Sequence, residues 1–189
     1  ERRKESRTLS LLQGISTTVV ANGGFSPLDI DAFLRSQTAF PIHQAEMIGL
    51  CALREAAGVT DLFAPAKRAQ VHTMEALCER ALQSGAAGVS LGPGYAPGTS
   101  LEEMEALCTM ARRYGRPAAI DTRMFAMTDL NSLSEAIELA EVTGCRMIVS
   151  HFEYQYGVGV EYKALEMLEL ARARGVDMRL DSGMYKDWC

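Results

Sequence analysis

The sequence predicts an α/β fold built on a parallel β-sheet, and three observations support this prediction. Helix-like stretches alternate with short apolar runs, as in βα units joined by right-handed crossovers. A glycine precedes each of four consecutive runs, and each run ends in a polar residue. These end residues, Ser90, Asp121, His151 and Asp181, are 31, 30 and 30 positions apart, about one βα unit. With 189 residues, 48% of them hydrophobic, the chain is long enough for one well-formed core.

The first third of the chain is the least regular part. A charged and then apolar stretch predicts a helix over 1–13, and β-branched residues predict a strand over 15–21. A short helix is expected over 28–37 and a weaker strand over 45–50. Residues 52–69 are expected to be irregular or loosely helical, because a proline interrupts them.

From residue 70 onward the apolar spacing is that of amphipathic helices, and each helix is followed by an apolar run. The patterns Ser100-x-x-Glu103 and Ser132-x-x-Glu135 each predict a capping box at the start of a helix. The strands expected in this part of the chain cover 86–90, 117–121, 146–151 and 177–181.

Six strands of this kind could form an open doubly wound sheet or most of an eight-stranded barrel. A dinucleotide-binding sheet would need a glycine-rich phosphate turn, but Gly92-Pro-Gly94 lacks the third glycine. Pro93 also removes an N–H that such a turn would offer to phosphate. No Walker A lysine is present either. We therefore expect a fold of the (β/α)8 TIM-barrel type.

Polar residues stand at the carboxyl ends of the predicted strands, where barrels of this type place their ligands. They are Asn22, Ser90, Asp121, His151 and Asp181. Histidine and carboxylate on neighbouring strand ends are the ligands of a hydrolytic Zn²⁺ or Mn²⁺ site. Each residue also has an ordinary structural interpretation, since a histidine there can simply be hydrogen-bonded and an aspartate can cap a turn. Their occurrence at the same point of three consecutive units favours a shared site.

The composition excludes several classes of function. A net charge of −5 and a pI near 5.3 argue against a nucleic-acid partner. No apolar segment approaches the roughly 20 residues that span a bilayer, so no membrane partner is expected. Five cysteines form no CxxC pair, which predicts reduced thiols of a cytoplasmic protein. His43, before a strand, and His72, on a predicted helix, are expected to be structural or solvated.

Three stretches resemble the N-acyl-D-amino-acid deacylases, the D-aminoacylase-type members of the metal-dependent amidohydrolase superfamily. The first two are 14–27 and 85–98, and the third is Val149-Ser-His-Phe152 followed by 171–177. The resemblance runs over nearly the whole chain. It implies a (β/α)8 barrel with a small flanking β-sandwich. The implied reaction is hydrolysis of an N-acyl amide bond, with one or two divalent metals, such as zinc, activating the carbonyl and water.

The resemblance also assigns roles to particular residues. His151 falls on the family's sixth-strand histidine ligand, whereas Asp121 falls on its fifth-strand histidine and Gly23 on its metal-binding cysteine. Asp121 and His151 are therefore the expected catalytic and metal-binding residues, with a gap at Gly23. Tyr95 lies in a loop that borders the substrate pocket in the family, and Arg123 is a candidate anchor for a substrate carboxylate.

The family's first-strand His-x-His and eighth-strand aspartate have no counterpart here, and the chain starts at Glu1 with no methionine. We therefore expect 1–189 to be one partial barrel domain, strands two to seven, cut from a longer protein. This fragment is expected to be inactive and to lack zinc, which the full-length parent would bind. Its two open sheet edges predict a homo-oligomer.

Two other functions remain open. A divergent barrel that binds a small ligand without catalysis would explain Gly23 and Asp121. A metal-free lyase using Lys163 or Lys186 is disfavoured, because neither lysine lies in a predicted strand.

Overall fold

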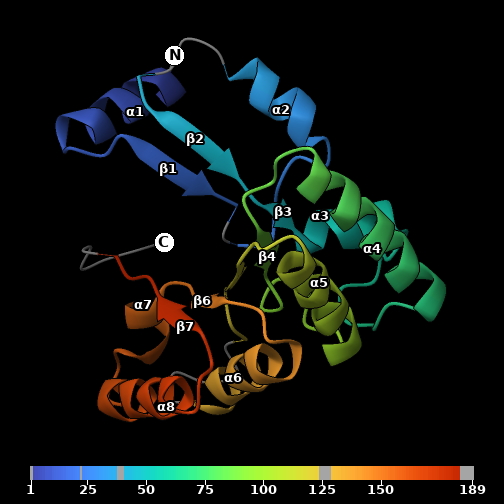
Figure 1. Ribbon diagram of the computed structural model, residues 1–189, viewed down its shortest axis with the longest axis vertical. Coiled ribbons are helices and arrows are strands. Elements are labelled where there is room, and N and C mark those ends of the chain that lie inside the picture. Colours follow the sequence, from blue (N-terminus) through green and yellow to red (C-terminus); the bar gives the residue numbers. More distant parts are fainter. Residues whose placement is uncertain (1, 22, 38–40, 124–128, 184–189) are drawn as a thin grey trace.

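The computed structural model describes residues 2–21, 23–37, 41–123 and 129–183. Its strands are all parallel and are paired in the order in which they occur along the chain (Figure 1). β1 pairs with β2, and the five strands from β3 to β7 form the second sheet. The strands are β1 Thr17–Val20, β2 His43–Glu46, β3 Ile48–Gly49, β4 Val89–Leu91, β5 Ala118–Ile120, β6 Met147–Val149 and β7 Met178–Leu180.

Six strands were expected, and the structure differs at the second. The run predicted over 45–50 is divided at Met47 into β2 and β3, which pair with different neighbours. β1 pairs with the first half of this run and β4 with the second half. The strands therefore form two separate sheets, and the break between them lies at Met47.

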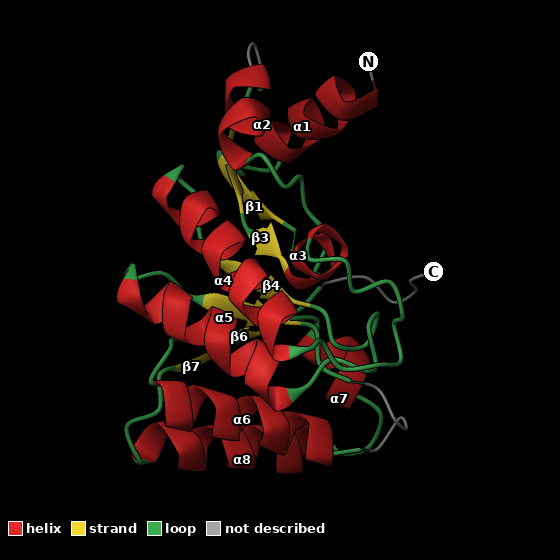
Figure 2. Ribbon diagram, turned by 90° about the vertical axis from the view of Figure 1, so that its right-hand side faces the viewer, coloured by secondary structure: helices red, strands yellow, loops and turns green. Residues whose placement is uncertain are grey.

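The helices α4, α5, α6 and α8 lie along one face of the sheet (Figure 2). Apolar residues between these helices and the strands form the core, including Met74, Leu107 and Ile120, none of which is exposed. The helices are α1 Arg2–Leu12, α2 Ile30–Ser36, α3 Leu50–Ala56, α4 Arg68–Gln83, α5 Leu101–Arg113, α6 Asn131–Thr143, α7 Phe152–Tyr156 and α8 Glu161–Ala173. None of the helices in the described residues has the length and apolar character needed to cross a membrane.

Two helices were not predicted in this form. α3 occupies 50–56, where the sequence indicated the end of a strand at 50 and an irregular or loosely helical stretch from 52, and α7 follows directly after His151. Both helices are short, with seven and five residues, and therefore show little apolar periodicity. The turn into α7 is made by His151 itself, which adopts a left-handed backbone conformation with φ of 55°.

One of the two predicted capping boxes is present. The Ser100 hydroxyl accepts a hydrogen bond from the Glu103 N–H, and the Glu103 carboxylate accepts one from the Ser100 N–H. The Ser132–Glu135 prediction was wrong, because α6 already begins at Asn131 and Ser132 lies inside its first turn. The Ser132 hydroxyl contacts Tyr156 instead.

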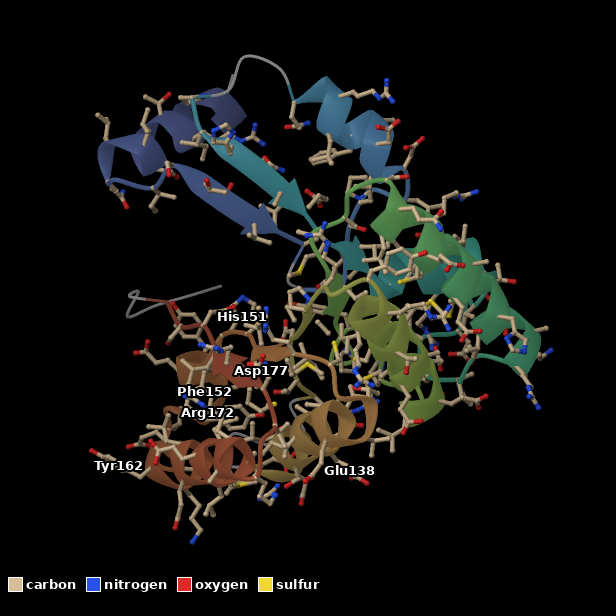
Figure 3. All side chains as sticks on the ribbon, viewed as in Figure 1. Glu138, His151, Phe152, Tyr162, Arg172 and Asp177 are labelled. Carbon is tan, nitrogen blue, oxygen red and sulfur yellow. The ribbon has the colours of Figure 1, made fainter. Side chains whose placement is uncertain are left out.

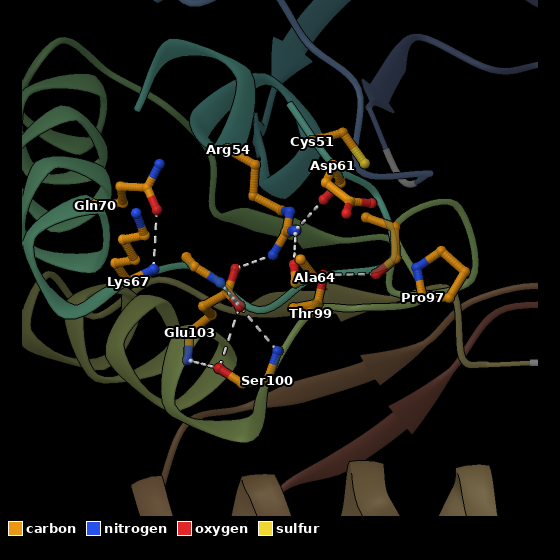
Figure 4. A network of polar contacts seen from close by, with 12 residues as sticks. Cys51, Arg54, Asp61, Ala64, Lys67, Gln70, Pro97, Thr99, Ser100 and Glu103 are labelled. Atoms are coloured by element: carbon orange, nitrogen blue, oxygen red, sulfur yellow. Dashed lines mark hydrogen bonds and ion pairs between the residues drawn. The ribbon is translucent and has the colours of Figure 1, made fainter. Parts of the chain in front are cut away.

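A buried ion pair joins α3 to α5, the helices that follow β3 and β4 (Figure 4). Arg54 of α3 and Glu103 of α5 contact each other with almost no exposure. Arg54 also donates to the carbonyl oxygens of Asp61 and Ala64 at 3.2 and 2.7 Å. Glu103 also accepts from Ser100, and Arg54 is bound to the loop at 61–64, so each charged group has hydrogen-bond partners besides the other. The pair therefore ties the loop after α3 to the start of α5.

Candidate functional site

Asp121, His151 and Asp181 lie together just beyond the carboxyl ends of β5, β6 and β7. His151 Nδ1 is 3.8 Å from Asp121 Oδ2, and the backbone N–H of His151 donates to Asp181 Oδ1 at 2.8 Å. Parallel strands in register bring equivalent positions side by side, which is why the regular spacing in the sequence becomes a cluster in space. In Figure 3, His151 lies away from α6 and α8, which carry Glu138 and Tyr162.

The Asp121 carboxyl group is the more enclosed member of the pair. Its side chain is 13% exposed, whereas that of His151 is 37% exposed. Burial raises the pKa of Asp121 above its ordinary value, and nearby Asp181 raises it further. The His151 charge and a hydrogen bond from Gln155 act in the opposite direction. A group with these opposing influences can serve either as a metal ligand or in proton transfer.

The remaining strand-end candidates are separate from this cluster. The Ser90 hydroxyl accepts the buried Gly24 N–H at 2.9 Å and therefore has a structural role. Asn22 lies outside the described residues. His43 begins β2 and is exposed, and His72 lies on α4 with its Nδ1 2.9 Å from Glu75, so neither adds to the site.

Tyr95 follows β4 in a loop, and its side chain is 53% exposed. Its ring packs edge-on against Phe25, with 5.2 Å between centroids. A Cβ added at Gly23 would lie 3.6 Å from the Tyr95 ring, an ordinary contact distance. Tyr95 and Gly23 are therefore neighbours, so the loops after β1 and β4 meet at this point.

Arg123 is only 8% exposed, and each of its guanidinium nitrogens already has a partner. Nε donates to the Glu135 carboxylate, and the other two nitrogens donate to the carbonyl oxygens of Pro97 and Thr99 at 2.7 and 2.5 Å. The expectation that Arg123 anchors a substrate carboxylate is not supported by this geometry. The residue instead connects α6 to the loop that carries Tyr95.

Sequence reasoning missed the polar residues behind Asp121. Gln155 donates to Asp121 Oδ1 at 2.6 Å, and Thr122 and Tyr156 extend the hydrogen-bond network. The signal in the sequence was weak, because these residues come from the segment just after β5 and from the unpredicted helix α7. Only their fold-dependent proximity shows that they act together.

The described residues do not form a complete metal site. Among them, no group of three or more His, Cys, Asp or Glu side chains is arranged to hold a metal ion. Asp121 and His151 supply two donors, while tetrahedral zinc in proteins takes three or four protein ligands. Gly23, at the position of the expected cysteine, contributes no side-chain donor.

Known proteins include relatives that are similar to nearly the whole length of this chain. No family model matches the chain. A D-aminoacylase of Alcaligenes xylosoxydans xylosoxydans is 27% identical over 97% of this chain and 43% of its own length. An N-acyl-D-glutamate deacylase from the same organism is 30% identical over 92% of this chain and 37% of its own length.

Solved structures agree with these relatives. A D-aminoacylase described as defining a novel subset of amidohydrolases superposes with a TM-score of 0.84 and 26% identity, over 97% of this chain and 44% of its own. An N-acyl-D-glutamate deacylase from Bordetella bronchiseptica gives a TM-score of 0.83 and 28% identity, over 96% and 44%. The expected partial (β/α)8 barrel is thereby confirmed. The chain is homologous to the D-aminoacylases and N-acyl-D-glutamate deacylases of the amidohydrolase superfamily, over a segment that spans less than half the length of those proteins.

Proposed function

We propose that this chain is the central part of a metal-dependent hydrolase that cleaves the linear amide bond of an N-acyl-D-amino acid. The observation that carries the proposal is the pairing of Asp121 with His151 at the ends of adjacent parallel strands, in a homologue of deacylases. One structural relative contains a binuclear metal centre, and another was solved with zinc and a phosphonate that mimics the tetrahedral intermediate. The chemistry of those relatives makes amide hydrolysis the first function to test.

In the full-length parent, His151 and Asp121 would contribute a nitrogen and an oxygen ligand to zinc, which would supply Lewis-acid chemistry when bound. These two donors are too few to hold the ion against water by themselves. We therefore expect the missing ligands to come from parts of the parent outside these 189 residues. The 189-residue chain should be inactive as it stands.

The residues of this chain would act mainly by holding the site in place. Asp181 accepts the His151 N–H and so fixes the backbone that presents the imidazole. Tyr95, half exposed beside Phe25, is the residue of the β4 loop best placed to contact a small N-acyl amino acid. A small-molecule amide is therefore the expected partner.

The test is hydrolysis by the full-length protein with zinc supplied. We expect turnover of N-acetyl-D-amino acids, a much slower reaction with the L isomers, and loss of activity in His151→Ala. A stoichiometric zinc content that falls in the same variant would tie the metal to this residue. No turnover of any N-acyl amino acid by the zinc-loaded protein would count against the proposal.

The alternative is a divergent member that binds a small ligand without catalysis. Gly23 and the two-donor set favour it, because both leave the metal site short of ligands. Gly23→Cys separates the two ideas, since a Cβ at this position is accommodated at 3.6 Å from Tyr95. If zinc content and activity are present in the wild type and change together in this variant, the binding-only function is excluded.

We further propose that the chain self-associates and that it is located in the cytoplasm. β1 is an edge strand, and its Val19 side chain is 55% exposed, which supports pairing with another copy of the chain. Cys51, Cys78, Cys108 and Cys145 are free thiols, which suits a reducing compartment.

A further inference from the structure

Gln155 is a buried polar residue that no expectation from the sequence included. It lies on α7, one turn after His151, and is 6% exposed. Its Nε2 donates to Asp121 Oδ1 at 2.6 Å, and its Oε1 accepts from Thr122 Oγ1 at 2.6 Å. A buried amide with both ends satisfied at short range has a fixed orientation.

The orientation of this amide can be deduced from its neighbours. Nε2 also lies 3.3 Å from the carbonyl oxygen of Thr122, which can only accept. The nitrogen must therefore face this side, and the oxygen must face the Thr122 hydroxyl.

The hydroxyl hydrogens further along the network follow from that assignment. Thr122 uses its hydrogen on Gln155, so it accepts from the Tyr156 hydroxyl at 2.8 Å. The Tyr156 oxygen lies 2.9 Å from the Ser132 hydroxyl, whose single hydrogen goes either to Tyr156 or to the Asp129 carbonyl oxygen at 3.2 Å. The donors from Tyr156 to Gln155 all point toward Asp121, an arrangement that favours negative charge on this carboxylate.

The consequence concerns the two oxygens of Asp121. The hydrogen bond from Gln155 fixes Oδ1, so the carboxylate cannot turn freely about its last bond. Oδ2 is then the oxygen that faces His151 Nδ1. The position of Oδ2 therefore depends on Gln155.

We propose that Gln155 is a positioning residue, which sets the orientation of the Asp121 carboxylate toward His151 with Thr122 holding the amide in place. This inference deepens the proposed function, because it names what aligns the two residues on which that function rests. The hydrogen bond from Gln155 explains why the Asp121 carboxylate, whose charged form burial disfavours, is kept in a single orientation beside His151. Neighbours that orient a metal ligand or a catalytic group typically change affinity or activity about 10- to 100-fold when removed.

The test uses NMR of the 189-residue chain at fixed pH. In the wild type, one side-chain amide proton of Gln155 should resonate downfield of the Gln83 amide protons, since Gln83 donates to a neutral tyrosine hydroxyl at an exposed position. Asp121→Ala should move the Gln155 signal upfield. Thr122→Val should broaden or shift it, and Thr122→Ser, which keeps the hydroxyl, should restore it.

A second measurement reads the effect at the histidine. Gln155→Leu should shift the ring nitrogen signals of His151, while those of His43 and His72 stay in place as internal references. The matched control, Gln83→Leu, should leave all three rings unchanged. Thr122→Val should reproduce the His151 shift in part, and this variant serves if Gln155→Leu does not fold.

The proposal is overturned if the His151 ring signals are unchanged in folded Gln155→Leu, or in Thr122→Val if that variant serves. It is also overturned if the Gln155 amide is insensitive to Asp121→Ala. Neither measurement needs turnover or metal. A missing deacylase activity with these shifts present would reject the proposed function alone.

Discussion

Arg123 and Glu135 form a largely buried ion pair, with 2.9 Å between Nε of the arginine and Oε2 of the glutamate. The same guanidinium donates to the carbonyl oxygens of Pro97 and Thr99. Arg123 therefore ties the loop that carries Tyr95 to the end of β5, two residues beyond Asp121. One side chain thus holds two borders of the candidate site together.

Replacing this arginine should destabilise the protein. Arg123→Met leaves Glu135 unpaired and two carbonyl oxygens without donors, so we expect a loss of about 3 kcal/mol in the free energy of unfolding. Urea denaturation measures it. Arg113→Met, which removes an exposed and longer contact to Glu79 at 3.8 Å, is the matched control and should change stability by less than about 0.5 kcal/mol. Equal losses of stability in the two variants would show that the buried Arg123–Glu135 ion pair contributes little.

The backbone at His151 offers a second test. Its φ of 55° is left-handed, a conformation that glycine adopts without cost and alanine does not. Both His151→Gly and His151→Ala remove the imidazole, so their difference reports the backbone alone. We expect the glycine variant to be more stable by about 1 kcal/mol in urea denaturation.

A matched pair at an ordinary helical position should show the opposite order. Glu153 lies inside α7, where Glu153→Ala should be more stable than Glu153→Gly by about 1 kcal/mol. If alanine were preferred at both positions, the left-handed turn between β6 and α7 would be incorrect.

Glu46 should make stability depend on pH. Burial raises the pKa of this carboxyl group, partly offset by the hydrogen bond from Gln44 and by the Arg7 charge. Because the folded-state pKa exceeds the unfolded value, the folded protein binds more protons in the window between the two values. Its stability therefore falls as pH rises through this window, from about 4.3 for an unfolded glutamate upward.

The substitution Glu46→Gln removes this dependence. We expect the variant to be more stable than the wild type at pH 7, and to lose that advantage at a pH below 4.3, where both side chains are neutral. Urea denaturation at the two pH values measures the difference. An advantage that grows on acidification would mean that Glu46 is stabilised as the charged form.

The exposed edge at β1 predicts self-association. Val19 is 55% exposed on this strand, and Leu12 and Ile15 just before it are 78% and 41% exposed. We expect the chain to elute as a dimer or larger species in size-exclusion chromatography with light scattering, and Val19→Lys to shift it toward monomer. A wild type that is a monodisperse monomer would mean that the edge is protected within one copy.

Sequence periodicity was sufficient for the architecture from β4 onward. The spacing of Ser90, Asp121, His151 and Asp181 predicted four strand ends, and three of these residues lie together in the structure. Parallel strands with one helix between them repeat at a nearly constant length, so a local pattern suffices to place the strand ends. Residues 50–56 and 152–156 were harder, because helices of one or two turns show little amphipathic signal.

The sequence by itself determined the alternation of helices and strands, the acidic and thiol-containing character of the chain, and the residue types at the strand ends. Only the tertiary structure decided what Arg123, Gln155 and Ser90 do. Each is a polar side chain whose partners lie far away along the chain, such as Thr99 for Arg123 and Asp121 for Gln155. A buried polar group takes whichever partner the fold brings within hydrogen-bonding distance, and this distance is a property of the packed helices and strands and not of the local sequence.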